Sequence, residues 1–351
     1  MKNYVGLDVS MKTTFICIVN EEKKIVFEAE VETDPSMIFS EIQKTGLTIE
    51  KCAIESSSLS RWLEQELLKK GLTTICVDAR KMSRVLSINI NKTDKNDARL
   101  IAEALRCGFY TEVYSKSQEH VELNILMGSR RTLIETATKL KNTIRGHLKA
   151  FGIRLGTANN QKFSEIVIEA IKTRTGAVQV GVNGLLASFQ HTIGQIQILE
   201  TKIEALARED EDVKLLTTIP GVGVITAYTF ISSLGDPKRF KNSRAVGAYL
   251  GMTPTQYSSG ETKKQGRVSK CGDPEVRALL NECAFVILYA TKSWSCLKAW
   301  GQKIKKKRGH KKAVMAIGRK LAVLMHRMLI TRKAFEHGSV KDKQETMQKV
   351  C

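Results

Sequence analysis

The hydrophobic pattern changes near Glu119, and this change limits the fold more than any other feature of the sequence. Before it, short β-rich runs alternate with polar turns and short helical patterns. After it, apolar residues recur every three, four or seven positions over long stretches. Strands and helices need different periods, so we expect an α/β part followed by an all-α part.

The first part is expected to form a central mixed sheet. Three β-rich runs follow one another across short polar turns, which is typical of an antiparallel meander, and two later runs each follow a helical pattern. The expected strands are residues 4–10, 13–20, 24–31, 51–56 and 73–78, and the expected helices are residues 36–44 and 60–70.

Two long apolar seams follow, over residues 126–151 and 189–206; in each, apolar residues recur at helical spacing and so form one apolar face of a helix. Seams of this length predict a helical hairpin or a coiled coil between subunits, with the stretch holding Gly176, Gly181 and Gly184 as the connection. A third, helical region begins near Val213. The expected divisions are a catalytic domain over 1–117, a helical domain over 118–212, a third domain over 213–335 and a polar tail over 336–351.

Charge points to a polyanionic partner. Lys and Arg number 56 against 36 Asp and Glu, a formal net charge of +20, and residues 283–335 hold fourteen Lys or Arg and no acid. Such a surplus favours nucleic acid as the partner.

No apolar run approaches the roughly 18–20 residues that span a bilayer. The N-terminus has no signal-peptide layout, so we expect a cytoplasmic protein without a membrane partner. The eight cysteines never form CxxC, which favours reduced thiols over zinc or disulfides.

Four carboxylates are the candidate metal ligands. Asp8 and Glu55 each end a strand-like run, and Asp94 and Asp97 open a helical pattern three residues apart, on one helical face. Carboxylate oxygens hold Mg²⁺, and two such ions can assist an in-line phosphoryl displacement. The structural alternative differs by residue: Asp94 could be a helix cap and Asp97 an acid favoured by the helix dipole. Asp8 and Glu55 are harder to explain structurally, because each is a carboxylate within an apolar strand pattern, where burial without a partner is costly. As a set of four, they favour metal ligation.

The third region holds further signals for nucleic acid. The run IPGVG at 219–223, followed by a helical pattern, is typical of a helix-hairpin-helix whose backbone contacts phosphate, although a plain tight turn is the alternative. The loop Pro254–Gly260 contains Ser259, and no His/Asp pair lies nearby to support a hydrolase triad. The residues expected to contact nucleic acid are Gly221, Val222, Gly223, Lys263, Lys264, Arg267, Lys270, Arg277, Lys305, Lys306, Lys307, Arg308, Lys311, Lys312, Arg130, Arg131 and Arg145.

Taken in order, these blocks resemble the DEDD-type transposases of the insertion-sequence 110 family, relatives of the Piv DNA invertase. The resemblance covers residues 1–335 and rests on GLDVS, AIESS, KTDKNDARLIA, IPGVG, the Pro254–Gly260 loop, GRVSKCGD and the basic C-terminal helix. It implies a RuvC-type, RNase H-like N-terminal domain, a coiled-coil middle and a C-terminal transposase domain.

The resemblance also implies roles for residues. Asp8, Glu55, Asp94 and Asp97 would be the DEDD ligands of Mg²⁺ or Mn²⁺, and Ser259 would be the serine that links to cleaved DNA. Its neighbour Ser258 stays open as the nucleophile, and Ser269 is a weaker choice. Cys271 stands where the family often has a basic residue. The implied partners are double-stranded DNA of the element ends and target, a bridge RNA, and further copies of the chain as a homodimer or homotetramer.

The leading hypothesis is therefore a metal-dependent recombinase that moves a DNA element through a serine–DNA intermediate, at a centre composed from the carboxylates and the serine loop. One alternative is a junction-resolving nuclease that uses a metal-activated water and needs no serine. A second alternative is a non-catalytic nucleic-acid-binding protein. A third is a sugar-kinase-like ATPase, suggested by GLDVS alone and not supported by any second phosphate loop.

Overall fold

The computed structural model describes residues 1–86, 93–259 and 262–338 and divides the chain into two compact units, Met1–Ser115 and Lys116–Cys351. Residues 339–351 of the expected tail, and Gly260 of the expected serine loop, lie outside the described residues. The division of the second unit into a helical and a transposase domain stays a prediction. No helix of the described residues is long and apolar enough to cross a membrane.

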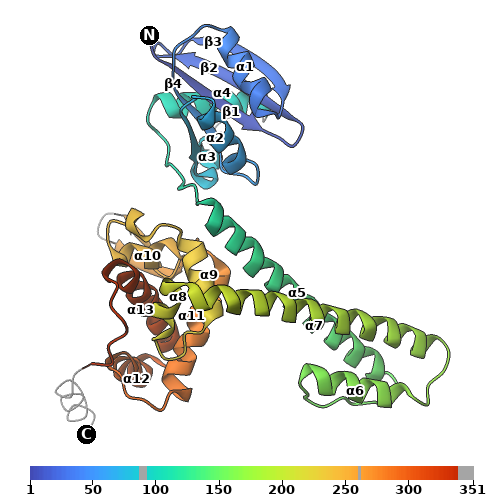
Figure 1. Cartoon of the computed structure of the whole chain (residues 1–351). Helices are drawn as coiled ribbons and strands as arrows, with labels where there is room; N and C mark the ends of the chain where they lie inside the picture. Colours follow the sequence, from blue (N-terminus) through green and yellow to red (C-terminus); the bar gives the residue numbers. More distant parts are fainter. Residues whose placement is uncertain (87–92, 260–261, 339–351) are drawn as a thin grey trace. The chain divides into compact units, whose positions relative to one another are not determined.

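The first unit is built on the mixed sheet expected from the sequence (Figure 1). Its strands lie in the order β3-β2-β1-β4-β5, with β1–β2–β3 antiparallel and β1–β4–β5 parallel. The strands are β1 (Asn3–Val9), β2 (Thr13–Asn20), β3 (Ile25–Glu32), β4 (Ile49–Glu55) and β5 (Thr74–Val77), and the helices are α1 (Pro35–Lys44), α2 (Ser60–Lys69), α3 (Ala79–Leu86) and α4 (Asp94–Arg106).

Alternation along β1 and β4 sends apolar side chains to both faces of the sheet. On one face, Leu7 and Ile54 are fully buried in a cluster shared with α1 and α2. On the other face, Ala53 packs with α4 residues such as Ile101. Cys17, Cys52 and Cys76 are buried, which confirms their expected role as small core residues, and burial raises the pKa of the Cys52 thiol to about 12.

The second unit begins with a helical hairpin. Helices α5 (Gln118–Lys149) and α7 (Ala177–Glu209) run side by side, and α6 (Asn160–Ile171) packs near the far end of the pair (Figure 1). Phe163 of α6 and Phe189 of α7 meet edge to face at 5.4 Å between ring centroids. The seams therefore pair within one chain, which is the hairpin alternative; a contact between subunits stays a prediction.

The expected glycine connection is wrong in part. Gly176 precedes α7, but Gly181 and Gly184 lie inside that helix, so the connection is shorter than the glycine spacing indicates. Each helical glycine costs about 1 kcal/mol relative to alanine. Burial of Val182 and Leu186 from the same turns offsets that cost, because apolar packing outweighs intrinsic propensity.

The rest of the second unit is a helical body around one core. Its elements are α8 (Glu211–Thr217), α9 (Val224–Leu234), a 3₁₀ turn (Pro237–Arg239), α10 (Ser243–Tyr249), α11 (Pro274–Phe285), a π-helical turn (Val286–Ala290), α12 (Cys296–Arg308) and α13 (His310–Thr331). Two strands, β6 (Pro254–Ser259) and β7 (Thr262–Val268), form an antiparallel hairpin where we expected only a loop. The basic run 303–308 forms the end of α12 and precedes α13.

Candidate active site and nucleic-acid interface

Asp8 and Glu55 occupy equivalent places on the two central parallel strands. Gly6 pairs with Ala53 and Leu7 with Ile54, so Asp8 and Glu55 follow at the carboxyl ends of β1 and β4. Two residues earlier on each strand, Gly6 and Ala53 face α4. Because side chains alternate along a strand, Asp8 and Glu55 lie on that same face. Both side chains are half-buried.

Helix α4 brings the other two carboxylates to the same end of the sheet. A Cβ on Gly6 would lie 2.2 Å from the Ala98 carbonyl oxygen, so the helix crosses β1 in direct backbone contact. At the other end of α4, Arg106 Nη1 donates to the Glu21 carbonyl at 3.3 Å, next to the start of β1. Helix α4 is therefore antiparallel to β1, and its first turn lies toward the carboxyl end of that strand.

The first turn of α4 also decides one structural alternative. The helix cap is Thr93, whose side chain accepts from the Asn96 N–H at 3.2 Å, so Asp94 is not the cap. Asp94 is exposed, whereas Asp97 is buried with 5% of its surface exposed. A buried carboxylate is costly without compensation, and the helix dipole is one favourable contribution at this position.

The donor chemistry of the four residues fits a hard divalent cation, because all four supply carboxylate oxygens. Within residues 1–86, 93–259 and 262–338, however, no three Asp, Glu, His or Cys side chains are grouped closely enough to hold a metal ion. The structure thus brings Asp8, Glu55, Asp94 and Asp97 to one end and one face of the sheet, without a closed cluster of three. Their role as metal ligands stays a prediction.

An ion pair holds α4 to the edge of the sheet. Arg99 Nη2 donates to Glu28 Oε2 of β3 at 2.9 Å, its Nε donates to Oε1, and Lys95 Nζ lies 2.9 Å from Oε2. The Arg99 hydrogen bonds hold the pKa of the Glu28 carboxyl below its usual range, with Lys95 adding to the effect. The pair anchors the helical turn that follows Asp94 and Asp97.

Replacing Arg99 by Met is expected to raise the pKa of Glu28 and to remove a small acid-sensitive part of the stability. Because the folded-state pKa is lowered, the stabilisation is present above the usual carboxyl pKa of about 4.3 and is lost as pH falls through the lowered value. For a partly exposed pair the loss should be at most about 1 kcal/mol. An NMR titration of Glu28 in both proteins measures it, and an unchanged pKa in Arg99→Met would contradict the assignment.

Ser259 lies at the end of β6, exposed, at the tip of the β6/β7 hairpin and opposite Thr262. Ser258 pairs with Lys263 in the strand register; the side chains of these two residues lie outside the described part of the structure. The hairpin base is held by close backbone packing, since a Cβ on Gly272 would lie 2.3 Å from the Tyr249 carbonyl oxygen. The Ser269 N–H donates to the Thr253 carbonyl at 2.9 Å. The serine tip thus projects from a fixed base.

The glycine turn joins α8 to α9. Ile219 and Val222 are buried, and Gly221 has a φ of +86°, which favours glycine. The Val222 N–H donates to the Ile219 carbonyl at 3.0 Å, so this donor is used within the turn. Gly223 is the N-cap residue of α9 and has no side chain, so it gives the first backbone N–H groups of that helix no side-chain acceptor. Such an end suits an anion, and the phosphate contact stays a prediction.

The predicted basic contacts divide into exposed and internally bonded groups. Arg277 Nη1 donates to the carbonyls of Leu250 and Gly272 at 3.1 and 2.5 Å, which fixes the hairpin base. Arg130 bonds Glu200 across the α5/α7 pair at 2.6 Å. Arg131 bonds Glu135 at 2.9 Å, and Arg145 bonds the Gly156 carbonyl at 3.1 Å. The exposed residues are Lys264, Arg267, Lys270, Lys306, Lys307, Arg308, Lys311 and Lys312, and Lys305 is half-buried.

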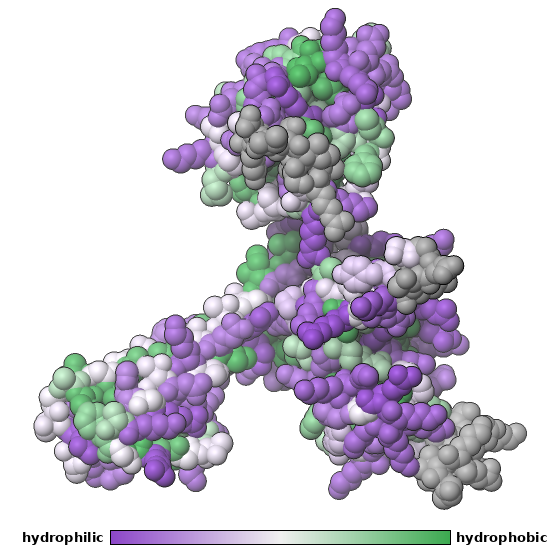
Figure 2. Space-filling model, turned by 180° about the vertical axis from the view of Figure 1, so that it is seen from behind, coloured by the Kyte–Doolittle hydropathy of each residue, from purple (hydrophilic) through white to green (hydrophobic). Residues whose placement is uncertain are grey.

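The surface of the helical body is largely hydrophilic on the side shown in Figure 2. Gly309 divides the basic run into two parts, one at the end of α12 and one at the start of α13. Sequence inspection missed three exposed rings beside this run: Phe285, Tyr289 and His310. Phe285 and Tyr289 lie in an apolar run without lysine, and only His310 lies within the basic run, so the residue pattern did not indicate the rings.

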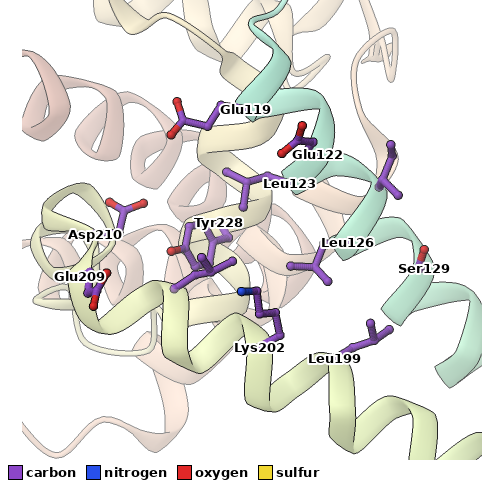
Figure 3. Close-up of a pocket in the computed structure, with 12 residues that line it drawn as sticks. Glu119, Glu122, Leu123, Leu126, Ser129, Leu199, Lys202, Glu209, Asp210 and Tyr228 are labelled. Atoms are coloured by element: carbon purple, nitrogen blue, oxygen red, sulfur yellow. The ribbon is translucent and has the colours of Figure 1, made fainter.

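A cavity of about 870 Å³ lies between α5, α7 and α9 (Figure 3). It is lined by Leu123, Leu126 and Tyr228 and by the acidic residues Glu119, Glu122, Glu209 and Asp210. Burial, followed by the charge of Asp210, raises the pKa of Tyr228 to about 12. Four carboxylates against one lysine, Lys202, make this lining acidic, which disfavours binding of a phosphate backbone there.

Comparison with known proteins gives two family matches. The transposase family described as DEDD_Tnp_IS110 matches residues 5–153, and the family described as Transposase IS116/IS110/IS902 matches residues 213–299. The first match spans all four candidate carboxylates, and the second spans the glycine turn and Ser259.

Individual relatives align over most of the chain. The transposase for insertion sequence element IS1111A of Coxiella burnetii is 26% identical over 341 residues, which cover 95% of this chain and 92% of the relative. A probable family 20 transposase of Pseudomonas aeruginosa is 23% identical over 342 residues, covering 95% of this chain and 98% of the relative. The transposase for IS1328 of Yersinia enterocolitica is 29% identical over 211 residues, covering 57% of this chain and 60% of the relative.

Proposed function

We propose a two-part cleavage mechanism for this chain, which belongs to the IS110/IS116/IS902 family of transposases and is therefore an enzyme of DNA strand transfer. In this proposal, carboxylates of the first unit hold a divalent cation, Mg²⁺ or Mn²⁺, and Ser259 of the second unit is the nucleophile. The observation that carries it is the placement of Asp8, Glu55, Asp94 and Asp97 at one end and one face of the sheet. The strand order also supports a RuvC-type, RNase H-like first unit.

The chemistry assigned to Ser259 is a transesterification. Its Oγ attacks a DNA phosphorus, the Oγ–P bond forms as a P–O ester bond of the strand breaks, the serine proton passes to water, and the leaving DNA oxygen takes a proton from water. The phosphoserine keeps the ester bond energy, so the reverse reaction with a new DNA hydroxyl rejoins strands without ATP. A cation held by the carboxylates would stabilise the charge that develops on the phosphate.

The partners belong to the same proposal. The basic helices α12 and α13 and the glycine turn supply sequence-independent phosphate contacts, and the described residues include no zinc cluster that would read bases. A bridge RNA that pairs with element ends and target would provide the missing sequence information. A homodimer or homotetramer would hold the two duplexes. The protein would act on DNA in the cytoplasm of a prokaryotic cell.

A covalent protein–DNA adduct tests this proposal. Purified protein with its co-purifying nucleic acid, Mg²⁺ and an element-junction DNA should give the adduct on a denaturing gel. Ser259→Ala should abolish the adduct, and Ser258→Ala is the matched control one residue away. An adduct lost only in Ser258→Ala would move the nucleophile to that residue. Cleaved DNA without adduct, unaffected by Ser259→Ala, would favour the junction-resolving nuclease instead.

A further inference from the structure

We propose that Phe285, Tyr289 and His310 form a stacking platform for an unpaired base of single-stranded nucleic acid, with the lysines around it holding the phosphates. The inference rests on the nucleic-acid-binding part of the proposed function and not on the serine chemistry. It adds a ligand class, the face of an unpaired base, that the phosphate contacts do not include.

The three rings contact one another on the surface. The centroids of Phe285 and Tyr289 are 4.7 Å apart, and that of His310 lies 5.4 Å from Tyr289 and 6.0 Å from Phe285. Tyr289 Oη and His310 Nδ1 are hydrogen-bonded at 2.6 Å. Phe285 is 51% exposed and Tyr289 41% exposed. Single exposed rings are ordinary, but three joined rings form an apolar patch that a core does not require.

The backbone that carries Tyr289 is unusual. Helix α11 ends at Phe285 and the chain continues as a π-helical turn, closed by the Thr291 N–H donating to the Val286 carbonyl at 2.9 Å. Ile287 and Leu288 of this turn are buried in the core while Phe285 and Tyr289 are exposed. Single π-turns occur frequently at functional sites. The turn therefore holds the two rings outward on a buried anchor.

The positive charges around the rings indicate which class of ligand they would bind. Lys305 Nζ lies 4.4 Å from the centroid of Tyr289, and Lys306, Lys307, Lys311 and Lys312 are nearby in the sequence and exposed on α12 and α13. No carboxylate occurs between residues 283 and 335. Aromatic faces within a cationic surface are the recognition pattern for single strands, because each base stacks and each phosphate meets a cation. A duplex hides the faces of its bases, so the base must be unpaired.

The glycine turn at 219–223 packs against the start of the π-helical turn that carries Tyr289. A Cβ on Gly221 would meet the Val286 side chain at 3.0 Å, so the turn packs beside the residue that follows Phe285. The glycine turn that precedes α9 is therefore in contact with the segment that carries Phe285 and Tyr289. One strand that leaves a phosphate at the turn can place a neighbouring base on the platform.

Binding of matched strands with and without bases tests the platform. Fluorescence anisotropy, at one fixed salt concentration, would compare labelled oligouridine, oligothymidine, an abasic strand of equal length and a duplex. Phe285→Ala and Tyr289→Ala should each weaken binding of the base-bearing strands about fivefold or more, since one stack contributes roughly 1–3 kcal/mol. Binding of the abasic strand and of the duplex should stay unchanged. Phe109→Ala, which removes a ring that is 70% exposed in the other unit, is the matched control.

Further readouts separate stacking from structure and from catalysis. Tyr289→Phe keeps the ring and should bind like the wild type, and quenching of a 2-aminopurine probe should be lost only in the alanine variants. Equal losses for base-bearing and abasic strands, or no loss for either, would overturn the platform. A larger loss with oligouridine than with oligothymidine assigns the ligand to RNA, and the reverse assigns it to DNA. Failure of the serine adduct with intact base-dependent binding would overturn the mechanism and leave the platform standing.

Discussion

Replacing Asp97 by asparagine is expected to slow DNA cleavage by about 10³-fold or more while the first unit stays folded. A metal that stabilises charge in the transition state contributes several kcal/mol, and each 1.36 kcal/mol is about tenfold in rate. Asparagine keeps the volume and one carbonyl oxygen but removes the charge that would hold the cation. Of the four carboxylates, Asp97 is the buried one, with 5% of its surface exposed. It lies in the first turn of α4, toward the carboxyl end of β1.

The stability of the Asp97→Asn protein should change little. A buried carboxylate is costly to desolvate, so loss of its charge offsets the loss of its favourable place in the helix dipole. Single-turnover cleavage and thermal denaturation, measured on the same preparations, separate the two effects. Asp34→Asn is the matched control, because Asp34 caps α1 through the Ser36 and Met37 N–H groups and asparagine caps equally well.

A second readout does not depend on catalysis. If Asp97 helps to hold the cation, Mg²⁺ or Mn²⁺ should raise the Tm of the wild type with concentration and should raise that of Asp97→Asn much less, because a ligand that binds only the folded state stabilises it. Cleavage at the wild-type rate in Asp97→Asn would remove this residue from the site. An equal metal-dependent rise in both proteins would remove it from the ligand set.

Much of the first unit was predictable from local pattern. The five strand-like runs and the two early helices appear where the alternation of apolar and polar residues placed them. The relation between Asp8 and Glu55 followed from their places at strand ends. What the pattern could not supply is the direction of α4, which depends on contacts such as Arg106 with Glu21, far apart in the sequence.

The second unit shows where local signals fail. The β6/β7 hairpin has few apolar residues, so its strands carry no alternation that a sequence pattern could reveal, and its base depends on Gly251 and Gly272 packing against backbone. Gly181 and Gly184 indicated a connection because glycine is a poor helix former, yet tertiary packing of α7 overrode that preference. The ring platform was hidden because the basic run dominates the composition of residues 283–335.

Gly6→Ala is expected to destabilise the first unit by about 3 kcal/mol or more, the upper end of overpacking costs. The added Cβ would lie 2.2 Å from the Ala98 carbonyl oxygen, 2.4 Å from the Ala102 N and 3.0 Å from the Ala102 Cα. These are backbone atoms of a helix that is fully buried at both residues, so no flexible side chain can move aside. Such a loss is a large share of the roughly 5–15 kcal/mol that stabilises a domain.

The same substitution should also reduce cleavage beyond what unfolding explains, since relief of the overlap requires α4 to move away from β1 and would separate Asp97 from Asp8. Denaturant unfolding and cleavage below the melting range of the variant measure the two effects. Trimming a side chain cannot relieve a contact with backbone, so Gly6→Ala should not be rescued by Ala102→Gly. Gly128→Ala is the control: a Cβ there meets nothing within 4 Å, and alanine should stabilise α5 by about 1 kcal/mol. Wild-type stability and wild-type cleavage in Gly6→Ala would mean that α4 does not approach β1 this closely. In that case there would be no reason to expect Asp94 and Asp97 of α4 at the same end of the sheet as Asp8 and Glu55.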